Sequence, residues 1–353
     1  MIDIVLQRYA FLALLAAGLF GASTPLSKLL VAGIGPFSLA GLLYLGSGFG
    51  LLAVWLVQRH RGRGVEREAP LERSDFPWLV GAVASGGIAA PVLLLWALSG
   101  TSASGASLLL SAEGVLTALI AVLVFREAVD TRVWVASLLL LVAGGMLAYL
   151  PATGFGVSLH ALAVVGACAL WGLDNNLTRP ISGGDPVVIG MVKGLAAGSV
   201  NLAVGRLAGE AWPRLEYLTA AMTLGSLSYG ASLLFYILAL RHLGSARTAA
   251  HFGTAPFIGA ILSVILLREP LTGTLIAAFG LTLASTWLVL GERHGHLHRH
   301  GPLEHNHRHT QDSHHQHEHE GGEGPEPHVH PHRHEPLSHT HGHLPDFHHR
   351  HRH

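Results

Sequence analysis

Four ionisable residues lie inside long apolar stretches of the chain: Glu113, Asp174, Lys193 and His251. If such a stretch crosses a membrane, a charge at its centre costs about 2.5–3.5 kcal/mol or more, so an ionisable residue there usually serves a function. Desolvation disfavours the charged form of a carboxyl group, and histidine exchanges protons near neutral pH. Glu113 and His251 are therefore candidate proton-exchanging groups in a cavity. The alternative for each is a hydrogen bond between helices.

Asp174 and Lys193 lie in consecutive apolar stretches, and the polar run Asp174-Asn175-Asn176 would be poorly tolerated on a lipid-facing helix. Two interpretations stay open. The two side chains can form a buried ion pair that holds consecutive helices together, or they can line a cavity and bind charged substrate or exchange protons. The candidate cavity residues are thus Lys193, Asp174, Glu113, His251, Asn175 and Asn176. We expect Lys193→Ala to abolish transport and leave the protein folded.

The elements that must hold these residues are helices that span a membrane. Of 353 residues, 50% are hydrophobic and 12% are charged, whereas soluble proteins carry about 25% charged residues. A helix needs about 20 mostly apolar residues to cross a bilayer. Ten such stretches occur, at about 9–31, 35–57, 77–98, 103–124, 131–150, 159–178, 186–207, 217–240, 246–267 and 272–291. Pro91 and the segment from Gly253 to Pro256 predict local breaks in two of them.

Several classes of protein are excluded by this composition. A soluble globule and a basic nucleic-acid binder are disfavoured, and one cysteine, Cys168, forms neither an internal disulfide nor a cysteine zinc cluster. With the N-terminus inside, the inner loops carry eleven Lys/Arg residues and the outer loops four, which favours that orientation. We expect a multi-pass protein of the inner or plasma membrane, with both termini cytoplasmic and no cleaved leader.

The chain repeats itself. Phe20-Gly21 and Ser27-Lys28 match Trp171-Gly172 and Thr178-Arg179 at a shift of 151 residues. At a shift of 142 residues, Phe125-Arg126-Glu127 matches Leu267-Arg268-Glu269. Each repeat holds five helices, and because five is odd, the second copy crosses the membrane in the opposite sense. Many secondary carriers are built from such inverted repeats, with the substrate site near the midplane between the two halves.

These motifs resemble the drug/metabolite transporter superfamily, and more specifically its EamA-type members, over about residues 9–291. The resemblance implies an all-α membrane fold of ten transmembrane helices in two inverted five-helix repeats, and carrier-type export of small molecules. Glu127 and Glu269 correspond to the helix-end glutamates of that family. We assign residues 1–150 to the first repeat, 151–291 to the second, and 292–353 to a disordered cytoplasmic tail.

The tail holds 22 of the 26 histidines, and residues 298–319 recur as 332–353 at a shift of 34. Imidazole is a common ligand of Zn, Ni, Co and Cu, and in an extended chain residues i and i+2 point the same way. The tail is therefore expected to bind transition metal, with a pH-sensing polycation as the competing interpretation. The candidate ligands are His298, His300, His305, His307, His309, His314, His315, His332, His334, His339, His341, His343, His348 and His349.

From these patterns we predict a secondary transporter that exports a small organic metabolite by alternating access and needs no cofactor. One alternative is a transition-metal (Ni, Co or Zn) exporter fed by the tail, and another is a membrane scaffold without transport. No enzyme is expected, because the sequence lacks zinc-protease, phosphate-binding and Ser/His/Asp patterns. Expected partners are the small-molecule substrate, membrane lipid and transition-metal ions, with a second copy of the chain as a candidate and no nucleic acid.

Overall fold

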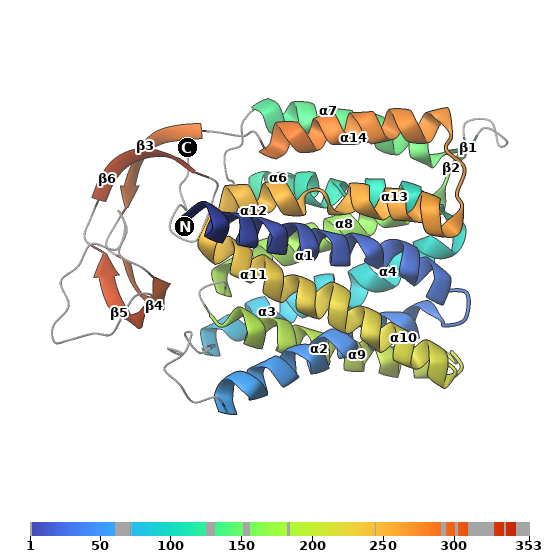
Figure 1. Cartoon of the computed structure of the whole chain (residues 1–353), viewed down its shortest axis with the longest axis horizontal. Helices are drawn as coiled ribbons and strands as arrows, with labels where there is room; N and C mark the ends of the chain where they lie inside the picture. The colour runs from blue at the N-terminus through green and yellow to red at the C-terminus, as the bar shows by residue number, and fades with distance from the viewer. Residues whose placement is uncertain are drawn as a thin grey trace.

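The computed structural model describes residues 2–60, 71, 73–124, 131–150, 156–181, 184–243, 245–290, 294–300, 303–309, 328–334 and 337–343. Helices make up almost all of the described part before residue 291 (Figure 1). The helices of the first repeat are α1 (Ile2–Leu30), α2 (Pro36–His60), α3 (Phe76–Ala82) and α4 (Ala90–Gly100), then α5 (Ala103–Leu109), α6 (Ala112–Leu123) and α7 (Thr131–Ala148). A single turn, η1 (Arg73–Asp75), leads into α3, and the π-helical segment η2 (Val83–Ala89) joins α3 to α4.

The second repeat follows the same order. Its helices are α8 (Leu159–Thr178), α9 (Pro186–Leu207), α10 (Leu215–Gly225) and α11 (Ser232–Leu243), then α12 (Ser245–Phe252), α13 (Ala255–Leu267) and α14 (Gly273–Leu290). The turn η4 (Arg179–Ile181) ends α8, and the π-helical segment η5 (Ser226–Ala231) joins α10 to α11.

Ten helical spans result, because four of them consist of two helices each. Among the described residues, seven spans are long and apolar enough to cross a membrane. Two further apolar helices, Trp134–Ala148 and Gly273–Leu288, are shorter. The 20-residue helix α8, which carries the polar run Asp174-Asn175-Asn176, completes the set. The predicted all-α fold of ten helices in two repeats is confirmed. Figure 1 shows two opposite sides of the helical bundle: α7 lies beside α14 on one side, and α2 lies with α9 and α10 on the other.

Both repeats are interrupted at matching places. The fourth span breaks between α5 and α6, at Leu110 and Ser111, and the ninth breaks between α12 and α13, at Gly253 and Thr254. A shift of 142 residues carries Ser111 onto Gly253. The same shift carries η2 onto η5 within one residue. The break expected at Gly253 to Pro256 is present, and near Pro91 the helix widens into a π-helical segment just before the proline, which sits at the start of α4.

Glycines let the helices of the two repeats approach closely. An added Cβ at Gly21 of α1 would lie 2.4 Å from the carbonyl oxygen of Ala255 in α13, and one at Gly172 of α8 would lie 2.9 Å from the amide nitrogen of Thr117 in α6. Small residues at such crossings are the usual basis of helix packing in membranes, where van der Waals contact replaces the hydrophobic effect. The repeated Phe/Trp-Gly motif therefore serves the same crossing in both halves.

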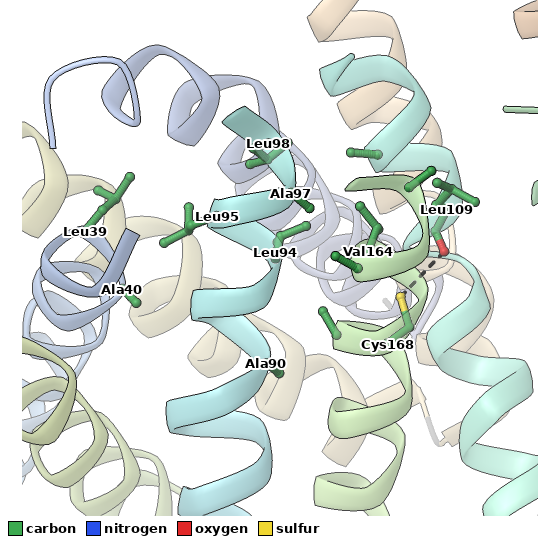
Figure 2. Close-up of a cluster of buried hydrophobic side chains, with 14 of the residues drawn as sticks. Leu39, Ala40, Ala90, Leu94, Leu95, Ala97, Leu98, Leu109, Val164 and Cys168 are labelled. Atoms are coloured by element: carbon green, nitrogen blue, oxygen red, sulfur yellow. Dashed lines mark hydrogen bonds between the residues drawn. The ribbon is translucent and has the colours of Figure 1, made fainter. Parts of the chain in front are cut away.

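The largest apolar core lies where α2, α4, α5, α6 and α8 meet (Figure 2). Leu95, Leu98 and Val164 are fully or almost fully buried in it. Cys168 is also buried, and its thiol donates to the carbonyl oxygen of Leu109 at 3.5 Å. This core fixes α8 against α5 and α6, next to the break in the fourth span.

Short strands complete the described residues. β1 (Tyr149–Leu150) pairs with β2 (Gly156–Val157) between the repeats. In the tail, β3 (His294–His300) pairs antiparallel with β6 (Leu337–His343), and β4 (Leu303–His309) pairs antiparallel with β5 (His328–His334). The tail was expected to be disordered, and its described segments are these four strands.

Candidate functional site

The two helix breaks meet around one cavity. Its volume is about 240 Å³, and it is lined from the first repeat by α1, α5 and α6 and from the second by α11, α12, α13 and α14. Ser111 and Gly253, the repeat-related residues at the two breaks, both line it. Broken helices expose backbone groups and accept irregular geometry only where they border a cavity or are buried in protein. The cavity is accordingly the first candidate for a binding site.

Glu113 is the charged residue that faces this cavity among the described lining residues. It lies in the first turn of α6, where the positive end of the helix dipole favours a carboxylate. Its Oε1 accepts a hydrogen bond from Asn175 Nδ2 at 3.0 Å, and Asn175 also reaches Thr117 Oγ1 at 3.2 Å. No ion pair to Glu113 occurs within the described part of the chain. An uncharged amide thus orients the carboxylate, and no described cation is bonded to it.

Aromatic rings form one wall of the cavity. The lining residues Phe20, Tyr236 and Phe252 come from α1, α11 and α12. The ring centroids of Phe20 and Phe252 are 5.4 Å apart, and those of Tyr236 and Phe252 are 5.0 Å apart with an interplanar angle of 68°. Phe252 therefore touches the other two rings and joins them into a continuous aromatic surface.

Two serine hydroxyls add unused hydrogen-bonding capacity. Ser107 and Ser111 line the cavity, and their Oγ atoms are buried without a hydrogen-bond partner among the described residues. A buried polar atom without a partner costs free energy unless water or a ligand satisfies it. The sequence-based reasoning missed both serines. Their spacing of four residues, which an unbroken helix would place on one face next to Glu113, was the available signal.

Asp174 and Lys193 lie elsewhere. Lys193 Nζ donates to both carboxylate oxygens of Asp174, at 2.6 and 2.8 Å, and Thr178 Oγ1 donates to Asp174 Oδ1 at 2.9 Å. Their side chains are 19% and 9% exposed, and neither lines the cavity described above. This pair joins α8 to α9. Its charges cancel, and a cargo-binding role for either residue remains a prediction.

The other predicted residues are also placed. Asn176 Nδ2 donates to the carbonyl oxygens of Gly172 and Thr117, at 2.8 and 3.0 Å, and so fastens α8 to α6. His251 lies on α12 outside the cavity lining, where its Nδ1 is 2.6 Å from the carbonyl oxygen of Arg247. Of the six candidates, the structure brings Glu113 to the cavity and Asn175 to Glu113.

A pair of ionic residues that we call the clasp, Lys28 and Glu269, lies at the start of α5, the helix that carries the lining residue Ser107. The Glu269 carboxylate accepts hydrogen bonds from the amides of Ala103, at 2.7 Å, and Ser104, at 2.9 Å, at the start of α5. Lys28 Nζ donates to the carbonyl oxygens of Leu98 and Thr101 in the preceding turn. The clasp therefore joins α1 and the end of α13 to the α4–α5 connection. Glu127, which corresponds to Glu269 in the first repeat, lies outside the described residues.

No metal centre occurs within the described helices. Among the residues that the structure describes, no group of three or more His, Cys, Asp or Glu side chains could hold an ion. Of the predicted ligands in the tail, His314, His315, His348 and His349 lie outside the described residues, and the others occupy the tail strands.

Comparison with known proteins decides the family. Residues 7–149 and 158–291 each match the EamA-like transporter family, one match for each repeat. The chain belongs to the EamA-like transporter family. It is 27% identical over 279 residues to an uncharacterized transporter of Methanothermobacter thermautotrophicus. The aligned region covers 75% of this chain and 81% of that transporter. A solved crystal structure has the same fold, with a TM-score of 0.56 and 18% sequence identity. The match covers 80% of this chain and 95% of the chain in that structure.

This EamA-like transporter is a multi-pass membrane protein, and its family motifs now have a physical basis. Gly21 and Gly172 permit the crossings of α1 with α13 and of α8 with α6. Glu269 ties the ninth span to the fourth. Glu113 has no counterpart in the second repeat, because the shift of 142 residues places Ala255 at its position. The scaffold is thus duplicated, whereas the charged group of the cavity is not.

Proposed function

We propose that this EamA-like transporter is a secondary carrier that exports a small organic metabolite by alternating access. The observation that carries the proposal is the cavity of about 240 Å³ between the two helix breaks, with Glu113 on its wall. Both repeats contribute to it, so a motion of one half against the other would change its exposure. The cavity residues make no catalytic pair, and the protein is proposed to be a transporter without enzymatic activity.

The clasp supports alternating access. Glu269 joins the second repeat to the start of α5 through two hydrogen bonds, and Lys28 fastens α1 to the α4–α5 connection through two more. Hydrogen bonds to charged groups contribute about 1.5–3 kcal/mol each, so several of them stabilise a closed arrangement that can still open. The arginine bias of the loops favours an orientation with the clasp on the outer side of the inner or plasma membrane and both termini in the cytoplasm.

The tail is proposed to bind transition metal and to buffer or sense it. The register of its strands supports this proposal, because His296 is paired with His341 and His307 with His330. Alternate residues of a strand share a face, so these pairs place histidines of two strands next to each other. The metals expected from imidazole chemistry and availability are zinc, nickel and cobalt, with copper favoured by affinity alone.

Transport in inside-out vesicles tests the proposal. Vesicles with the full-length protein and empty control vesicles are incubated with an isotope-labelled extract of cellular metabolites, and their contents are analysed by mass spectrometry. We expect at least one organic solute to accumulate only with the protein, and less of it with Glu113→Gln. An exposed carboxylate, Glu216, provides the matched control Glu216→Gln, since its ion-pair partner among the described residues is Arg214 on the surface. Absence of any protein-dependent organic solute would reject this function.

The duplicated histidines favour a second candidate, a transition-metal exporter fed by the tail. The absence of a metal-binding group in the described helices counts against it. The same vesicles, loaded with a metal-sensitive dye, are offered zinc, nickel and cobalt in turn. A dye response that requires both the protein and its tail would establish metal export. If the protein binds metal but no metal enters the vesicles, the tail acts as a buffer or sensor.

A further inference from the structure

We propose that the cargo of the cavity is a monovalent organic cation with an apolar body, of the ammonium type. The inference rests on the proposed carrier function and names its substrate class. Three features of the cavity carry it: an uncompensated carboxylate, an aromatic wall and buried hydroxyls without partners. Each restricts the cargo in a different way.

The first feature is the net charge of the buried polar groups. The Asp174–Lys193 pair is internally neutral, because both oxygens of Asp174 bind the Lys193 ammonium within 2.8 Å. Glu113 bonds only to the neutral amide of Asn175 among the described residues. Among the described residues, the titratable groups that act electrostatically with it are Asp174, Lys193, Tyr44, Tyr236 and Cys168. The one cation among them is already paired, so a single positive charge is missing from the cavity, and a proton or a cationic cargo supplies it.

The second feature is the aromatic wall. Phe20, Tyr236 and Phe252 form a continuous surface in the cavity that Glu113 also lines, with centroid separations of 5.0 and 5.4 Å. Rings of this kind bind ammonium groups through the negative potential of their faces, and aromatic cages are the common means of recognising quaternary ammonium ions. A divalent metal ion prefers several oxygen, nitrogen or sulfur ligands, and no group of three or more His, Cys, Asp or Glu side chains that could hold one is present among the described residues.

The third feature is the pair of hydroxyls. Ser107 and Ser111 present buried oxygen atoms to the cavity with no partner in the described structure. A hydroxyl oxygen accepts a hydrogen bond from an N–H or O–H group or lies against the partial positive charge of a methylammonium group. The cavity therefore offers one full negative charge, acceptor oxygens and apolar rings to one molecule.

The repeat structure argues that this charge belongs to recognition. Several features that hold the fold together occur twice, such as Gly21 with Gly172 and the break at Ser111 with that at Gly253. The Asp174–Lys193 pair occurs once, but its charges cancel. Glu113 occurs once, and its repeat-related position is Ala255. The scaffold is therefore built without a carboxylate at the equivalent site. A charge that packing does not require is best explained by what the cavity binds.

Binding of matched probes to the purified full-length protein, measured by isothermal titration calorimetry, tests the inference. Choline and 3,3-dimethylbutan-1-ol have the same shape and differ in charge, and benzyltrimethylammonium adds an aromatic body. We expect choline to bind at least about tenfold more tightly than the neutral alcohol, and benzyltrimethylammonium more tightly than choline. Glu113→Gln should remove the preference for charge, Phe252→Leu should weaken both cations, and Glu216→Gln should bind as the wild type does.

The outcomes separate this inference from the proposed function. Equal affinity for the alcohol and choline, or unchanged cation affinity in Glu113→Gln, would overturn the cation assignment. Because Gln keeps the shape of Glu and can still bond to Asn175, a melting temperature equal to that of the wild type shows that a lost preference is not a folding defect. If the vesicles accumulate a neutral or anionic solute, the carrier function is supported and the assignment of a cationic cargo is rejected. If they accumulate no solute at all, the carrier function itself is rejected.

Discussion

Lys193 on α9 and Asp174 on α8 form a two-pronged ion pair, with Nζ 2.6 and 2.8 Å from the two carboxylate oxygens. Both side chains are largely buried, at 19% and 9% exposed. Removing one partner of a buried pair leaves an uncompensated charge, and the penalty is large. The pair thus acts as a stabilising contact between two consecutive helices, which changes what a substitution of Lys193 is expected to do.

Lys193→Ala should destabilise the protein by about 3 kcal/mol, instead of leaving the fold intact as expected from the sequence. Thermal unfolding in detergent, followed by tryptophan fluorescence, measures the effect. The matched variant is Lys193→Met with Asp174→Asn, which removes both charges and keeps much of the volume, and it should recover most of the loss. A wild-type melting temperature for Lys193→Ala would show that the pair contributes nothing to stability.

Gly21→Ala should destabilise the crossing of α1 with α13. The added Cβ would lie 2.4 Å from a backbone oxygen of Ala255, which cannot move without displacing the helix. Overpacking of this kind costs about 1–3 kcal/mol. Gly18→Ala on the same helix is the control, because an added Cβ there has no neighbour within 4 Å. Equal melting temperatures for the two variants would contradict the proposed tight crossing.

The sequence predicted the ten spans, the two repeats and the break at Gly253 to Pro256, because each depends on patterns along the chain. It identified Glu113 but could not distinguish between cavity and contact roles for Asp174 and Lys193. That distinction depends on which helices touch, and packing between helices is decided by small residues such as Gly172 on faces that apolar stretches do not reveal. The aromatic wall was missed because Phe20, Tyr236 and Phe252 come from three different helices.

Glu269→Gln should loosen the contact between the ninth span and the start of α5 and so open the cavity on the side of Glu269. Glutamine keeps one acceptor oxygen but loses the charge that strengthens the bonds to the amides of Ala103 and Ser104. A loss of about 1.4 kcal/mol would raise the open population roughly tenfold. Gly114→Cys supplies a reporter, because Gly114 lines the cavity and an added Cβ there has no neighbour within 4 Å.

The measurement is the rate at which a membrane-impermeant maleimide labels this cysteine from the side of Glu269. Cys168→Ala removes the buried native thiol from all variants. Labelling should be several-fold faster with Glu269→Gln than without it, and unchanged with Glu216→Gln, an exposed carboxylate with no role in the clasp. If Glu269→Gln slows labelling or leaves it unchanged, the clasp does not control this side of the cavity.

Truncation after Arg293 should leave a stable membrane protein that binds far less metal. The ten helical spans end with α14 at Leu290, and within the described part of the tail the strands pair with one another. Size-exclusion chromatography with thermal unfolding tests the first part, and equilibrium dialysis with zinc or nickel tests the second. In the full-length protein, bound metal should be lost as the pH falls through the range in which imidazole takes up a proton, because only the neutral ring is a ligand. Metal retained by the truncated protein, or retained by the full chain after its histidines are protonated, would place the metal outside the tail.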